Sequence, residues 1–202
     1  MLSSYEPSLE ELQTACDNLK EKYLSLTGMK EMTGRAVIAV SKEEDGTYTL
    51  TAGVQGGTEG TDYQYSWSTG EQTRSITGKT ATELIAPIVT ITAPGMYGKL
   101  QAQLQVPDKP EAAVTIRGNS LELSWKTGDG KENQPAPESC RIQLYRDGEL
   151  VKTEERDSSE TGISFDDLDY GTAYTVKLWA VSPVGRSDMA ILTASIPAEG
   201  FG

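Results

Sequence analysis

The feature that most constrains the fold is a glycine turn followed by an alternating run of residues near the C-terminal end. The turn contains Gly171, and every second residue after it is apolar: Tyr174, Val176, Leu178 and Ala180. Successive side chains of a β-strand point to opposite faces, so this run predicts a strand with one buried face. A second turn, at residues 183–187, leads back into a last strand.

Similar alternating runs occur along most of the chain from residue 35 onward. They cover residues 35–41, 48–54, 63–67, 89–92, 99–106, 121–126 and 140–144. A hydrophobic fraction of 37% is low for one deep core, but it suits two thin sandwiches with solvated outer faces. The 20 glycines and nine prolines supply the many turns that such sandwiches need.

The C-terminal half resembles a fibronectin type III domain. Trp125 ends an alternating run that matches the second strand of that family, with its core tryptophan, and residues 168–174 match the corner before the long strand. The resemblance implies a tyrosine corner, in which Tyr174 donates its hydroxyl to upstream backbone. Tyr170 stands where the family usually has proline.

The preceding segment resembles the immunoglobulin-like repeats of bacterial surface and phage proteins. Residues 65–70 read YSWSTG, and Thr73, Ser75 and Ile76 follow them. The resemblance implies that Trp67 lies in a core, in a domain without the cysteine pair of antibody domains. Residues 94–97 are similar to a tyrosine corner, but Tyr97 is out of phase with the following strand. Either a bulge corrects the phase or no corner forms here.

These observations predict a mainly β chain with an N-terminal helix and two tandem β-sandwiches. We expect a helix and linker at residues 1–34, in which residues 29–34 are the linker. An immunoglobulin-like sandwich is expected at residues 35–107, and a fibronectin type III sandwich at residues 108–202. The proline-containing segment 107–110 predicts a short, stiff connection between the two sandwiches.

The N-terminal helix is predicted from a capping box and a narrow apolar stripe. Ser8 and Glu11 have the capping-box spacing, and Gly28 supplies a C-terminal stop. Six residues recur at alternating spacings of three and four and define the helix seam: Leu9, Leu12, Cys16, Leu19, Tyr23 and Leu26. Such a seam is typical of helix–helix pairing. Two arrangements remain open: a helix packed on the following sandwich, or a helix that docks or oligomerises.

Composition excludes several classes of function. The net charge of −12 argues against nucleic-acid binding, because no basic stripe is present to replace phosphate counterions. The chain has no histidine, which excludes most hydrolase triads and zinc sites. Cys16 and Cys140 lie in different predicted domains and are expected to be free thiols. The acidic runs at residues 154–157 and 166–169 are expected to be solvated loop charge, so we predict no enzyme activity, no metal and no cofactor.

An aromatic pair offers a candidate ligand surface. If Tyr174 and its partners face the core, then Trp179 faces outward, and Tyr145 on the neighbouring strand has the same parity. Such rings suit a sugar or a protein partner. The alternative is that arginine and lysine side chains, or the adjacent sandwich, cover Trp179.

We therefore expect a non-enzymatic structural or binding protein of a bacteriophage particle, such as a capsid decoration, head-fibre or tail accessory protein. Expected partners are virion proteins or a second copy of the chain, with a cell-surface glycan for the exposed sandwiches. We expect neither nucleic-acid binding nor membrane insertion. The expected location is the virion, because residues 1–13 lack a signal-peptide pattern. The alternative is a spacer or adhesion module of a secreted bacterial surface protein or glycan-degrading enzyme, located at the cell surface or outside the cell.

Overall fold

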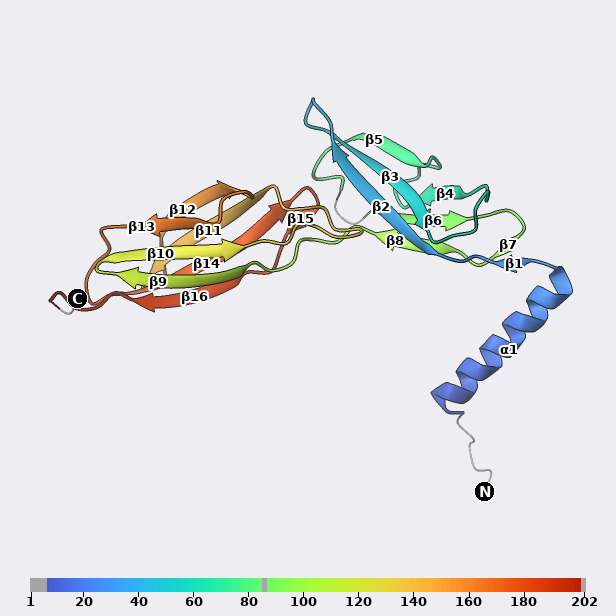
Figure 1. Cartoon of the computed structure of the whole chain (residues 1–202), viewed down its shortest axis with the longest axis horizontal. Coiled ribbons are helices and arrows are strands. Elements are labelled where there is room, and N and C mark those ends of the chain that lie inside the picture. The colour runs from blue at the N-terminus through green and yellow to red at the C-terminus, as the bar shows by residue number, and fades with distance from the viewer. Residues whose placement is uncertain (1–6, 85–86, 201–202) are drawn as a thin grey trace, which may run out of the picture.

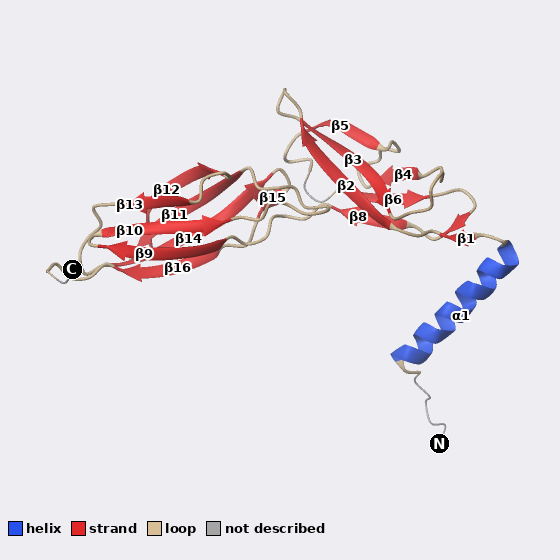
Figure 2. Ribbon diagram, viewed as in Figure 1, coloured by secondary structure: helices blue, strands red, loops and turns tan. Residues whose placement is uncertain are grey.

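The computed structural model describes residues 7–84 and 87–200. An N-terminal helix precedes two β-sandwiches, which follow one another along an elongated molecule (Figure 1). Strands make up both sandwiches, so the chain is mainly β, as the alternating runs predict (Figure 2). The helix projects from the end of the molecule that lies opposite the C-terminus.

Helix α1 (Leu9–Thr27) begins and ends where its capping residues predict. The Ser8 hydroxyl accepts the Glu11 N–H at 3.2 Å, and the Glu11 carboxylate accepts the Ser8 N–H at 2.8 Å. Gly28 has a φ of 70° and donates its N–H to the Leu24 carbonyl at 2.9 Å. Both ends of the helix are therefore satisfied by local hydrogen bonds.

The N-terminal sandwich packs two three-stranded antiparallel sheets against each other. Its strands are β2 (Arg35–Lys42), β3 (Tyr48–Gln55), β4 (Gln64–Trp67), β5 (Ser75–Lys79), β6 (Ile88–Thr92) and β8 (Leu100–Gln103). One sheet has the order β2-β3-β5 and the other β4-β6-β8. Trp67 is buried between them, as predicted, and its indole N–H donates to the Thr73 carbonyl at 2.9 Å. The predicted last strand is shorter than expected, because β8 stops at Gln103.

The segment predicted as a linker, residues 29–34, belongs partly to the N-terminal sandwich. Its strand β1 (Lys30–Glu31) pairs in parallel with β7 (Met96–Tyr97), and Met32 is buried in the sandwich core. The similarity of residues 94–97 to a tyrosine corner is misleading. Tyr97 lies in the connection between β6 and β8, is partly exposed, and contacts α1 instead of closing a corner.

The C-terminal sandwich pairs a three-stranded sheet with a larger one. Its strands are β9 (Glu111–Arg117), β10 (Ser120–Lys126), β11 (Ser139–Arg146), β12 (Glu149–Asp157), β13 (Gly162–Phe165), β14 (Ala173–Ser182), β15 (Gly185–Arg186) and β16 (Ala190–Ser195). The smaller sheet has the order β13-β10-β9, and in the larger sheet β12-β11-β14 continues to β15 and β16. Alternate residues of β10, β11 and β14 form the core, as their period of two predicts.

The predicted tyrosine corner is present, with the hydrogen bond reversed. Tyr174 is buried at the start of β14, and its hydroxyl accepts the Asp169 N–H at 3.0 Å. The sequence predicted donation from the hydroxyl to upstream backbone, so the partner segment is correct and the direction is not. Tyr170, at the position where the family usually has proline, is 46% exposed in the turn beside this corner, so its side chain is not packed in the core.

Candidate functional site

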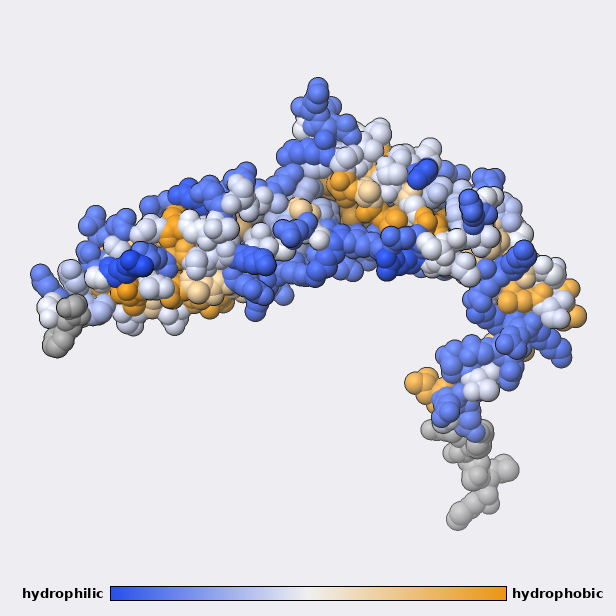
Figure 3. Space-filling model, in the orientation of Figure 1, coloured by the Kyte–Doolittle hydropathy of each residue, from blue (hydrophilic) through white to orange (hydrophobic). Residues whose placement is uncertain are grey.

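The helix seam is the most exposed apolar feature of the molecule. Its five large apolar side chains are exposed by 84% (Leu9), 48% (Leu12), 69% (Leu19), 47% (Tyr23) and 79% (Leu26). Cys16 is also exposed, and α1 contains no buried residue. Apolar surface appears at both ends of the projecting helix in Figure 3. Apart from Tyr23, whose ring contacts Tyr97, the seam has no partner among the residues that the structure describes.

Helix α1 is attached to the N-terminal sandwich by its C-terminal half. The Tyr23 ring contacts the Tyr97 ring with a centroid distance of 5.3 Å, and Lys20 forms an ion pair with Glu31. The hydrogen bond with Glu31 raises the pKa of Lys20 above its ordinary value. Of the two predicted arrangements, packing along the sandwich is not observed, because the remaining length of α1 lies away from it (Figure 1).

A second feature outside the sandwich cores is the junction between the sandwiches, built around Asn133. Strand β2 is the edge of its sheet, so its outer backbone groups need partners. The Asn133 side-chain oxygen accepts the Ile38 N–H at 2.6 Å, and its amide donates to the Ala36 carbonyl at 3.4 Å. The Asn133 carbonyl also accepts the Gln105 N–H at 2.7 Å. One loop of the C-terminal sandwich thus pairs with the edge of the N-terminal sandwich.

Charged and apolar contacts extend this junction. Glu138 accepts a hydrogen bond from the Tyr48 hydroxyl at 3.0 Å and forms an ion pair with Lys42 at 3.0 Å. Burial, followed by the contact with Glu138, raises the pKa of Tyr48. Val184, in the turn between β14 and β15, is 4% exposed and packs with the core of the N-terminal sandwich. Contacts to β2, to β3 and to the core of the N-terminal sandwich therefore join the two sandwiches.

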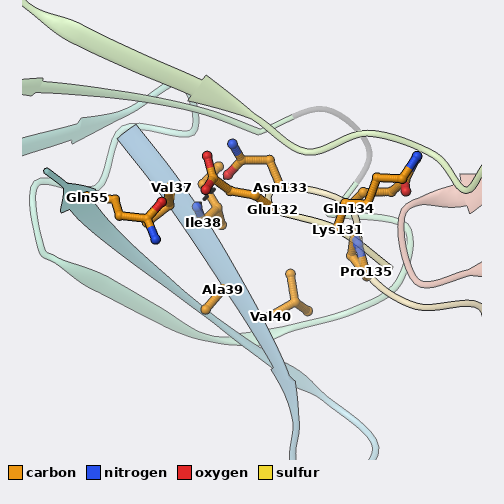
Figure 4. A pocket seen from close by; sticks show the side chains of 10 residues that line it. All are labelled: Val37, Ile38, Ala39, Val40, Gln55, Lys131, Glu132, Asn133, Gln134 and Pro135. Carbon is orange, nitrogen blue, oxygen red and sulfur yellow. Dashed lines mark hydrogen bonds between the residues drawn. The ribbon is translucent and has the colours of Figure 1, made fainter. Parts of the chain in front are cut away.

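A hollow of about 400 Å³ lies at the junction, between β2 and the loop at residues 131–135. Figure 4 shows Glu132 and Asn133 beside Val37 and Ile38 on β2. Arg35 closes this side through an ion pair with Glu132 at 2.7 Å. The hollow is therefore a gap between two joined domains, and its polar lining is engaged in joining them.

The predicted aromatic pair does not form an open platform. Trp179 has the expected outward parity, since it pairs with Arg141 across β11, but it is only 6% exposed. The Arg186 guanidinium lies 5.7 Å from its ring centroid, and Lys177 Nζ lies 4.2 Å from that of Tyr145. Of the two possibilities for Trp179, the covered one is observed, since the ring is buried and a cation from the neighbouring strand lies over it. A ligand role for Tyr145 and Trp179 stays a prediction.

The remaining chemistry-bearing residues are engaged in structure. Burial raises the pKa of the Cys140 thiol to about 11, so this thiol is protonated at neutral pH. The acidic run at residues 154–157 was expected in a loop, but it lies in strand β12, where Glu154 is paired with Lys152 and Arg156. In the second acidic run, Asp169 is paired with Arg146. Within residues 7–84 and 87–200, no three histidine, cysteine or carboxylate side chains are grouped to hold a metal ion. In the same ranges, no helix has the length and apolarity needed to span a membrane.

The junction residues are the ones that sequence reasoning missed. Asn133 lies in the polar segment 128–137 and Glu138 directly follows it, and Val184 lies in the turn at residues 183–187. One signal was present in the sequence. Val184 is an apolar residue at the tip of a turn, between Pro183 and Gly185, where polar residues are usual, so it could have been expected to pack against another surface.

Comparison with known proteins gives limited information. No protein-family model and no curated protein matches the chain. A segment of two fibronectin type III domains from chicken tenascin is 15% identical, with 83% of this chain and 98% of that chain covered and a TM-score of 0.44. Domains d3–d4 of the rat CD45 extracellular region are 18% identical, with 54% and 62% covered and a TM-score of 0.41.

The fibronectin type III domain of the human collagen alpha-1(XX) chain is 19% identical, with 50% of this chain and 93% of that chain covered and a TM-score of 0.40. These low scores carry no argument about ligands or partners. The fibronectin type III-like character of the C-terminal sandwich follows from its own strand order, β13-β10-β9 against β12-β11-β14-β16, and from the Tyr174 corner.

Proposed function

We propose that this chain is a non-enzymatic structural and binding protein that attaches through α1 and displays two joined sandwiches. The observation that carries the proposal is the helix seam, whose large apolar side chains are exposed by 47–84% on a helix without a fully buried residue. Monomeric soluble proteins seldom leave a contiguous apolar stripe exposed, and such stripes mark interaction sites. The seam therefore supports attachment, by docking or by oligomerisation.

The junction supports the display role. Asn133, Glu138 and Val184 fix the C-terminal sandwich to the N-terminal one, so the far end is held at a set distance from α1. A flexible linker would let the two sandwiches fold back on each other. A joined pair instead presents the outer sandwich away from the point of attachment, which suits adhesion to a surface or a glycan.

We place this protein on a bacteriophage particle, as a capsid decoration, head-fibre or tail accessory protein. Support comes from the YSWSTG stretch around Trp67 and its likeness to immunoglobulin-like repeats, which also makes an immunoglobulin-like N-terminal sandwich part of this proposal. The alternative is a spacer or adhesion module of a secreted bacterial surface protein or glycan-degrading enzyme. Neither role requires catalytic residues, in agreement with the lack of histidine.

Sequencing the genes that flank this one tests the particle role directly. Capsid and tail genes on both sides are expected. A reading frame that joins this chain to a signal peptide and a catalytic domain would instead establish the alternative.

Purified particles provide the second test. We expect particles banded on a density gradient to carry the chain. The Leu12→Glu/Leu19→Glu variant should be absent from them, because it places two charges on the seam. The Asn18→Glu variant is the matched control, because it adds a charge to an exposed position of α1 outside the seam. Equal loss of both variants, or retention of both, would contradict attachment through the seam.

A further inference from the structure

We propose that the partner of the helix seam is a second copy of this chain, and that two α1 helices pair in parallel and in register. The proposal rests on the proposed function, because it names the partner of the same attachment helix. It is argued from the spacing of the seam, the charges beside it, and the side of α1 on which the N-terminal sandwich lies.

The spacing of the seam calls for a helical partner. Its residues recur at three, four, three, four and three, an average of about 3.5 that keeps a stripe facing a neighbouring helix. In heptad notation, Leu9, Cys16 and Tyr23 take position a, and the three leucines Leu12, Leu19 and Leu26 take position d. Leucine at every d position is one half of the pattern of two-stranded parallel helices, whose a positions are usually β-branched. A helix that rests on a sheet has a broader stripe.

The residues that flank the seam permit pairing with an identical helix. Positions e and g are occupied by Gln13, Ala15, Lys20, Lys22 and Thr27. In a parallel pair, a g residue faces the e residue of the next heptad in the partner, so Ala15 faces Lys20 and Lys22 faces Thr27. No two like charges meet. The carboxylates of α1 lie at the outer positions b, c and f: Glu10, Glu11, Asp17 and Glu21.

The position of the N-terminal sandwich is compatible with the parallel direction. Lys20, at position e, forms an ion pair with Glu31, so the sandwich begins on one flank of the seam. In a parallel pair, a two-fold axis runs between the two helices. It places the e positions of the two copies on opposite sides of the pair, so the two N-terminal sandwiches point away from each other and do not clash. An antiparallel pair would bring the partner's acidic first turn, Glu10 and Glu11, toward Glu31 and the acidic remainder of the chain.

A groove beside the seam gives the pair additional apolar contact. It has a volume of about 500 Å³ and is lined by Cys16, Leu19, Lys20, Tyr23 and Tyr97. In a parallel pair, Tyr23 of each copy meets Tyr23 of the other at one layer, with Tyr97 of each copy beside it. The N-terminal sandwich thereby contributes a side chain to the paired helices.

Pairing also explains how an exposed helix of 19 residues is retained. Most of the stability of a protein helix comes from packing of its apolar face, and α1 has no fully buried residue. The seam spans fewer than three heptads, so the pair is expected to be weak and concentration-dependent. At a chain concentration of about 1 mM, dimers are detectable even if the free energy of association is only about 4 kcal/mol.

Cys16 reports on both pairing and direction. In a parallel, in-register pair Cys16 faces Cys16, whereas in an antiparallel pair it faces Leu19. Dibromobimane links two nearby thiols by forming two carbon–sulfur bonds with loss of two bromide ions. We expect this reagent to convert the full chain to a covalent dimer at about 1 mM. Cys140 is buried and does not compete, which the Cys16→Ser variant verifies by giving no covalent dimer.

Light scattering on the same samples completes the test. The mass of the full chain should rise with concentration and reach at least about 1.5 times that of one copy at about 1 mM. The Asn18→Glu variant should behave in the same way, and the Leu12→Glu/Leu19→Glu variant should stay a monomer. A monomeric full chain at this concentration would overturn self-pairing. A dimer without the Cys16 crosslink would overturn the parallel register.

The failure of this inference can be distinguished from failure of the proposed function. A monomeric chain that still attaches to particles through the seam overturns self-pairing and leaves the attachment role standing. A chain that forms the crosslinked dimer but is absent from particles supports self-pairing and overturns the particle role.

Discussion

The two ends of the N-terminal sandwich make opposite kinds of contact. At the end joined to the C-terminal sandwich, Asn133 pairs with the free edge of β2, and Val184 is buried in the neighbouring core. At the other end, α1 has satisfied caps but leaves its apolar seam exposed, except where Tyr23 contacts Tyr97. At the first end, residues of the C-terminal sandwich cover the edge of β2 and part of the N-terminal core. The open seam is a surface whose partner lies outside one copy of the chain.

The end of the N-terminal sandwich that is joined to the C-terminal sandwich is the closed end. The turn between β14 and β15 shows how closely it is assembled. Val184 points into the N-terminal core, and two residues later Arg186 lies over Trp179. One short turn thus covers an apolar face within its own sandwich and seals the junction with the other. If this comparison is correct, substitutions at the closed end lower the stability of the sandwiches, and substitutions in α1 do not.

The largest effect is expected for Trp179→Ala. Truncation of a buried tryptophan costs about 3–5 kcal/mol of unfolding free energy, and Trp179 is only 6% exposed. Urea unfolding followed by the fluorescence of the remaining tryptophans would measure the loss. The Arg186→Gln variant should lose much less, about 0.5–1 kcal/mol, because it removes only the cation over the ring.

The same variants decide the predicted ligand role of this surface. Destabilised but folded Trp179→Ala protein that adheres as well as the wild type would contradict binding through Trp179 and Tyr145. Wild-type stability together with lost adhesion would show that the ring is available to a ligand, and that the closed end is more open than its contacts indicate.

The strands were predictable because their period of two is a local property of the sequence. The alternating runs gave β3, β4, β10 and β14 nearly to the residue, and the capping box gave the start of α1. The two-residue strand β1 was missed because it is too short for any periodicity, and Met32 is a single apolar residue in a polar context.

The seam was predictable. For Trp179 the sequence left exposure and cover by a cationic side chain both open, and for the junction it gave no prediction. Parity gave the outward direction of Trp179, whereas its cover depends on where β15 brings Arg186. Asn133 looked like an ordinary loop residue, because its partners Ala36 and Ile38 lie almost one hundred positions earlier in the chain. Contacts between domains depend on how the domains are placed, and no local pattern encodes that placement.

The second prediction concerns Asn133, whose replacement should open the junction. Asn133→Gly retains the left-handed backbone, with a φ of 61°, but leaves the Ile38 N–H and the Ala36 carbonyl without their side-chain partner. We expect a loss of about 1–3 kcal/mol and a wider distribution of interdomain distances in small-angle X-ray scattering. Asn133→Asp keeps the acceptor for Ile38 and should lose less. Unchanged scattering from the glycine variant would contradict the role of Asn133 in the junction.

The third prediction is a pH dependence within the N-terminal sandwich. The hydrogen bond from Lys79, at 2.6 Å, together with bonds from Thr69 and the backbone, lowers the pKa of Glu71 from 4.5 to about 2. Because the folded pKa is below the ordinary one, the contribution of Glu71 is complete above pH 4.5 and is lost as the pH falls toward 2.

The Glu71→Gln variant tests this assignment. We expect it to be less stable than wild type by about 1–2 kcal/mol at neutral pH, and the difference should shrink between pH 4.5 and 2. Chemical unfolding at several pH values measures the difference. A difference that stays constant across this range would show that the ionisation of Glu71 does not stabilise the sandwich.

The smallest effect on the sandwiches is expected for Ser8→Ala, which removes the cap of α1. Loss of such a cap costs about 1 kcal/mol of helix stability, so far-ultraviolet circular dichroism should show less helix in dilute protein. The unfolding midpoints of both sandwiches should change little, because the contacts of α1 with the N-terminal sandwich involve Lys20 and Tyr23, in the opposite half of the helix from Ser8. Ser25→Ala, at an exposed position of the same helix without a capping role, is the matched control. If Ser8→Ala lowered the midpoint of the N-terminal sandwich, α1 would be part of that domain's stability and the seam would not be free for a partner.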